Sequence, residues 1–142
     1  MGDPAGIGPE ILIKAVEILR PQLAAGKIKL FVVGSRFCMR RAAGIVNCGT
    51  DWIESGLPGV ELVNIGDPAD ELFFGKTTAE AGKLAYLSIE KSVALCLAGE
   101  ADAIVTAPIS KEALNLAGHP FSGHTELLAH LTKARDSVML LA

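Results

Sequence analysis

Short apolar runs alternate with stretches of helical periodicity along the 142-residue chain, and this alternation constrains the fold more than any other feature. The run at residues 28–33 is rich in β-branched side chains and ends at Gly34, which is typical of a buried strand in a parallel sheet. Similar runs at residues 61–65, 103–105 and 137–142 predict further strands. Because helical segments separate these runs, we expect an α/β fold with a largely parallel sheet and flanking helices.

The helical segments carry the start and stop signals of globular helices. Expected helices lie at residues 9–21, 35–43, 77–99, 110–117 and 124–133. The third of these begins with a capping-box pattern, Thr77 followed by Glu80. It is also apolar on more than one side, so we expect the sheet to cover one side and another element or subunit to cover the other.

Composition narrows the class of protein. Half of the residues are hydrophobic, which is enough for one compact α/β unit. The sequence has neither a membrane-length apolar run nor a secretory start, so we expect a cytoplasmic protein without a membrane partner. The net charge of −3 argues against a nucleic-acid partner. Cys38, Cys48 and Cys96 are widely spaced and predict reduced thiols, with Cys96 on the buried stripe of the long helix.

Polar side chains gather at three junctions where a loop meets an expected helix. These are Gly-Asp-Pro-Ala-Gly-Ile-Gly-Pro-Glu at residues 2–10, Thr-Ala-Pro-Ile-Ser-Lys at residues 106–111, and Gly-His-Thr-Glu at residues 123–126. In α/β proteins such junctions meet at the carboxyl ends of strands, where ligands bind. A helix amino terminus favours a phosphate or carboxylate, to which His124 and Thr125 would add hydrogen bonds. A capped helix start without a ligand and a simple tight turn remain alternatives.

In this order, the three motifs resemble those of the NAD-dependent 4-hydroxythreonine-4-phosphate dehydrogenases of pyridoxal phosphate biosynthesis and their relatives acting on four-carbon phosphorylated sugar acids. The similarity also includes Ala81-Gly82 and Gly118-His119, and it covers essentially the whole chain. It implies a two-domain fold like that of isocitrate and isopropylmalate dehydrogenases. Residues 1–118 would form an α/β amino-terminal domain portion lacking its first strand. Residues 119–142 would start the second domain, and the carboxyl-terminal remainder would be absent.

The resemblance implies an enzyme that oxidises and decarboxylates 4-hydroxythreonine 4-phosphate. It further implies NAD, a divalent metal such as zinc, magnesium or cobalt, and a homodimer. Substrate-binding roles would fall on His124 and Thr125, while Asp3 and Lys111 would line the active site. Lys111 also lies in the first turn of a helix, where a cation is unfavourable for stability alone. The metal ligands are expected outside the chain, no catalytic residue is identified, and we expect the chain alone to be inactive.

Several alternatives stay open. Threonate or erythronate 4-phosphate is a second substrate choice, and an acyl-phosphate transferase or a non-catalytic phosphate-binding module is a choice of another class. Ser110 stands where the family often has His or Asn, which puts in doubt any role that needs those groups. His119 is expected to cap or pack in a turn, and His130 to be solvated or at the core edge. Neither has the spacing of a metal-ligand pair with His124.

Overall fold

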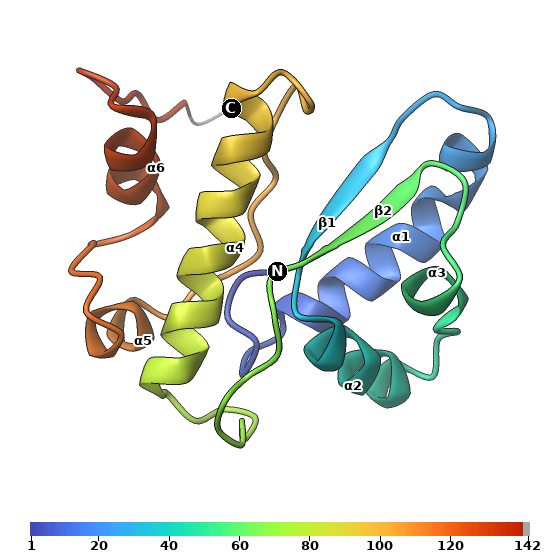
Figure 1. Ribbon diagram of the computed structural model, residues 1–142, viewed down its shortest axis with the longest axis horizontal. Coiled ribbons are helices and arrows are strands. Elements are labelled where there is room, and N and C mark those ends of the chain that lie inside the picture. The colour runs from blue at the N-terminus through green and yellow to red at the C-terminus, as the bar shows by residue number, and fades with distance from the viewer. Residues whose placement is uncertain (141–142) are drawn as a thin grey trace.

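The chain folds into a parallel two-stranded sheet with helices packed around it, as the computed structural model shows for residues 1–140 (Figure 1). In chain order the elements are α1 (Gly8–Ala24), β1 (Leu30–Gly34), α2 (Arg36–Val46), α3 (Asp51–Glu54), β2 (Val60–Asn64), α4 (Ala79–Leu97), α5 (Lys111–Leu116) and α6 (His124–Thr132). The register places Leu30 opposite Val60 and Gly34 opposite Asn64. The predicted α/β class is therefore confirmed.

Helix α4 lies between the sheet and the last two helices. It contacts β1 on one side and both α5 and α6 on the other (Figure 1). Leu84 belongs to the main core together with Val32 of β1, whereas Ile89 and Val93 form a second core with Leu127 of α6. The prediction that this helix is covered on two sides is confirmed, because its apolar residues serve two separate cores.

Two of the expected strands are wrong. Residues 103–105 and 137–140 have no strand structure, and the final two residues of the predicted run at 137–142 lie outside the described part of the chain. Val105 is 95% exposed. A strand requires a neighbouring backbone to pair with, and within residues 1–140 β1 pairs with β2 alone. An apolar β-branched run without such a neighbour stays irregular.

Several helix boundaries also differ from the sequence prediction: α2 continues to Val46 instead of ending at residue 43, and α3 lies where no helix was expected. Helix α1 continues through Pro21 to Ala24, since the buried Leu23 holds its last turn against the core. The Thr77 capping box is wrong, because Thr78 is the actual N-cap and its hydroxyl accepts a 3.1 Å hydrogen bond from the Ala81 amide. The Glu80 carboxylate instead accepts a hydrogen bond from the amide of Ala69. Glu80 thus ties the preceding loop to α4.

The cysteines and the apolar content of the helices complete the description of the fold. The three cysteines are free thiols, as predicted. Cys38 is buried, whereas Cys96 is only half-buried because it lies in the last turn of α4, where the covering elements end. None of the helices within residues 1–140 combines the length and the apolar composition needed to cross a membrane.

Candidate active site

The first two polar junctions touch each other directly. The Asp3 amide donates a 2.9 Å hydrogen bond to the Pro108 carbonyl. Gly2 has a φ of +72°, and a Cβ there would lie 2.4 Å from the Pro108 oxygen. Only glycine fits this left-handed, close-packed position without strain. The glycine-rich loop therefore runs against the segment that leads into α5.

The third junction adds His124, which is the first residue of α6 and is half-buried. Its Nε2 atom is buried and has no hydrogen-bond partner. Burial lowers the pKa of His124, and the nearby backbone of Ala107 partly opposes this effect. Burial therefore favours the neutral ring at pH 7, and its Nε2 is left without a hydrogen-bond partner.

Lys111 reaches from the start of α5 toward the start of α6. Ser110 caps α5 by accepting a 3.1 Å hydrogen bond from the Ala113 amide. The Cε atom of Lys111 lies 3.8 Å from the position that a Cβ on Gly123 would take. The missing side chain of Gly123 thus leaves space beside the lysine. The structure therefore brings Lys111 to the same junction as His124.

Asp3 and Thr125 lie in the loop and at the helix start that the sequence indicated, and they differ in their contacts. The Asp3 Oδ1 accepts a 2.8 Å hydrogen bond from the Ala5 amide, so this half-buried carboxylate first of all closes its own loop. Thr125 is half-buried in the first turn of α6, next to His124. Thr125 thus lies at the helix start, whereas Asp3 shapes the loop that runs against Pro108.

Contacts that the sequence did not reveal hold this junction together. A Cβ on Gly82 of α4 would lie 1.9 Å from the Ala113 oxygen, so glycine permits α5 to lie directly on α4. The rings of Tyr86 and His119 stack with their centroids 3.6 Å apart, which confirms that His119 packs in its turn. Gly82 within a helical pattern is a sequence signal of close backbone approach. No local sequence signal indicates that Tyr86 stacks on His119. His130 is exposed, as predicted.

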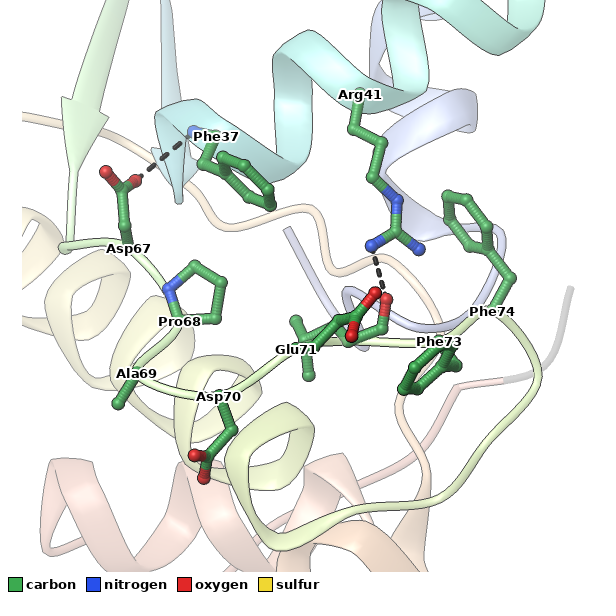
Figure 2. Close-up of a pocket in the computed structure, with 10 residues that line it drawn as sticks. Phe37, Arg41, Asp67, Pro68, Ala69, Asp70, Glu71, Phe73 and Phe74 are labelled. Carbon is green, nitrogen blue, oxygen red and sulfur yellow. Dashed lines mark hydrogen bonds between the residues drawn. The ribbon is translucent and has the colours of Figure 1, made fainter.

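A hollow of about 630 Å³ lies away from these residues, between α2 and residues 67–74 (Figure 2). The Arg41 guanidinium donates to the Leu72 carbonyl and lies 3.6 Å from the centroid of the Phe74 ring. Asp67 closes one side, where its Oδ1 accepts hydrogen bonds from the Ser35 hydroxyl and the Phe37 amide. This carboxylate occupies the amino terminus of α2, the position at which a dinucleotide fold would hold a phosphate.

Metal ligands were expected outside the chain. Within residues 1–140, no three side chains of His, Cys, Asp or Glu come together in a way that could hold a metal ion. The donor side chains within this range do not fit a divalent metal. The polar groups at the three junctions suit an anion instead.

The fold and site thus define an α/β protein with polar junctions beside the start of α6, a kind of site at which α/β proteins hold anionic ligands. The chain belongs to the family described as pyridoxal phosphate biosynthetic protein PdxA, whose family model matches residues 26–142. The resemblance drawn from the motifs is thereby confirmed.

Similar proteins and a similar solved structure support the family assignment. The chain is 43% identical to a D-threonate 4-phosphate dehydrogenase of Pectobacterium atrosepticum, with 99% of the chain and 45% of that relative covered. It is 38% identical to a 4-hydroxythreonine-4-phosphate dehydrogenase of Trichlorobacter lovleyi, with 100% and 44% covered. A crystal structure of a 4-hydroxythreonine-4-phosphate dehydrogenase from Burkholderia phymatum matches with a TM-score of 0.80 and 37% identity, covering 96% of the chain and 43% of that structure. The chain spans less than half the length of these relatives.

Proposed function

We propose that the chain is the amino-terminal part of a dehydrogenase that oxidises 4-hydroxythreonine 4-phosphate in pyridoxal phosphate biosynthesis, with NAD as the hydride acceptor. The proposal is supported by the family match and by relatives that are named dehydrogenases of phosphorylated four-carbon acids. A divalent metal bound outside residues 1–140, a homodimer, a cytoplasmic location and a domain boundary near residue 118 belong to the same proposal. The family match favours it over an acyl-phosphate transferase or a non-catalytic module.

The observation that carries the proposal is the buried Nε2 of His124, which lacks a hydrogen-bond partner. A buried polar atom without a partner costs about 1–3 kcal/mol, so its retention calls for a reason. A ligand oxygen at the start of α6 would satisfy it. The amides of the first helical turn and the Lys111 ammonium make that position favourable for an anion, in particular a phosphate.

In this proposal the residues of the chain bind and orient the substrate. His124 and Thr125 hold the substrate at the start of α6, and Lys111 contributes positive charge beside Gly123. Asp3 keeps the glycine-rich loop closed against Pro108 and so forms the facing wall. When NAD is bound, it accepts the hydride from the substrate. Holding the phosphate fixes the hydroxyl-bearing carbon relative to the rest of the active site.

D-Threonate 4-phosphate is the second candidate substrate. It is favoured by one specific observation, the 43% identity to the Pectobacterium atrosepticum enzyme against 38% to the Trichlorobacter lovleyi enzyme. The two acids share the phosphate and differ at carbon two. Competition between them for the full-length enzyme identifies the preferred substrate.

Substitution of His124 by Ala tests the proposal. A hydrogen bond to a charged group contributes about 1.5–3 kcal/mol, so the affinity of the full-length enzyme for the phosphorylated substrate should fall about tenfold or more. Affinity for NAD should change much less. Isothermal titration calorimetry with each ligand measures both quantities, and thermal unfolding serves as the control for folding. Unchanged substrate affinity, with a change only in stability, would show that His124 merely starts a helix.

A further inference from the structure

A carboxylate of the protein already lies beside the proposed phosphate position. The Oε2 of Glu126 is 3.7 Å from the point where a Cβ on Gly123 would stand, and the Cε of Lys111 is 3.8 Å from the same point. The Ser122 hydroxyl, the backbone amide of Glu126 and the nearby Lys111 lower the pKa of Glu126, so it is ionised at neutral pH. A carboxylate of the protein itself therefore lies at the start of α6, where the proposed function places the ligand.

We infer that Glu126 is an internal competitor of the bound anion, and that a phosphate must displace its carboxylate from the start of α6. This inference rests on the proposed function, because it assumes that the phosphate binds there. Glu126 is exposed, so its side chain has solvent to swing into when a ligand arrives. Lys111 lies beside the same glycine and stays in place for the ligand.

The competition has a consequence for ligand selection. A phosphate monoester carries about −1.5 to −2 charges near neutral pH and offers three acceptor oxygens, whereas a carboxylate carries one charge. A simple carboxylate ligand would gain little by replacing the Glu126 carboxylate, since the two groups are chemically alike. A phosphate gains both charge and hydrogen bonds. Glu126 should thus favour dianionic phosphate groups over carboxylates at this position.

The test is a titration of the chain with inorganic phosphate, followed by NMR through the backbone amides of His124 and Thr125. Glu126→Gln removes the charge but keeps a side chain that suits the first helical turn. The matched control is Glu100→Gln, which changes net charge by the same amount at an exposed position after the carboxyl end of α4. We expect Glu126→Gln to bind phosphate about threefold more tightly, the size typical of exposed charge pairs, and the control to match wild type.

Each outcome has a distinct meaning. If phosphate shifts no resonance of His124 or Thr125 in wild type, the proposed phosphate position itself is wrong. If wild type binds but Glu126→Gln binds equally or more weakly, the competitor inference is overturned and Glu126 instead positions Lys111. Acetate titrated in parallel measures the selectivity, and the preference for phosphate over acetate should decrease in Glu126→Gln.

Discussion

Replacement of Gly82 by Ala should destabilise the protein even though it improves the helix propensity of α4. The new Cβ would lie 1.9 Å from the Ala113 oxygen and 2.3 Å from the Ala113 carbonyl carbon. Carbon atoms pack at about 3.5–4.0 Å, so α5 would have to move away by about 1.5 Å. The obstructing atoms are backbone, and they have no rotamer change with which to escape. Neighbouring Leu114 is fully buried, so the displacement also opens the core.

Two opposing effects set the magnitude. Overpacking costs about 1–3 kcal/mol, and the upper part of this range applies because the clash is with backbone. Replacing Gly by Ala within a helix stabilises the helix by about 1 kcal/mol. We therefore expect the free energy of unfolding to fall by about 1–2 kcal/mol. Urea unfolding followed by circular dichroism measures this change.

Gly44 provides the matched control. It lies exposed in α2, and no atom stands within 4 Å of the position of an added Cβ. Gly44→Ala should therefore raise the free energy of unfolding by about 0.5–1 kcal/mol. The reasoning is refuted if Gly82→Ala is as stable as Gly44→Ala, because α4 and α5 would then not be in backbone contact.

Two further predictions concern the helix cap and the histidine. Thr78→Ala should lower the free energy of unfolding by about 1 kcal/mol, because the Thr78 hydroxyl accepts a hydrogen bond from the Ala81 amide. Thr77→Ala should have little effect. Equal losses of stability in urea unfolding would contradict the observed cap. The pKa of His124 should lie below the ordinary value of about 6.5, because burial outweighs the Ala107 backbone. The unfolded chain then binds the proton first, so this contribution to stability is complete above about pH 6.5 and is lost as the pH falls toward the folded-state pKa. An NMR titration of the imidazole measures this pKa, and a value at or above 6.5 would contradict the burial argument.

The sequence by itself determined many of the local elements and the family. The β-branched run at residues 28–33 became β1, Pro9 lies in the first turn of α1, and Gly118 follows α5 in a left-handed conformation. These features depend on the few residues around each position, which the chain carries whatever its tertiary structure. The same holds for the placement of His124 at a helix start, since a glycine before a periodic segment is a local signal.

The tertiary structure alone decided which of these pieces meet and which of them pair. Residues 103–105 have the composition of a strand but no pairing partner within the described chain, because a strand depends on a backbone far away in sequence. The contact of Asp3 with Pro108 and the fit of Gly82 against Ala113 are likewise long-range and follow from packing geometry. The buried nitrogen of His124 is of the same kind, since burial is a property of the surroundings and not of the residue. The chain thus specifies the chemical groups of the candidate site locally, and packing of α4, α5 and α6 brings them together.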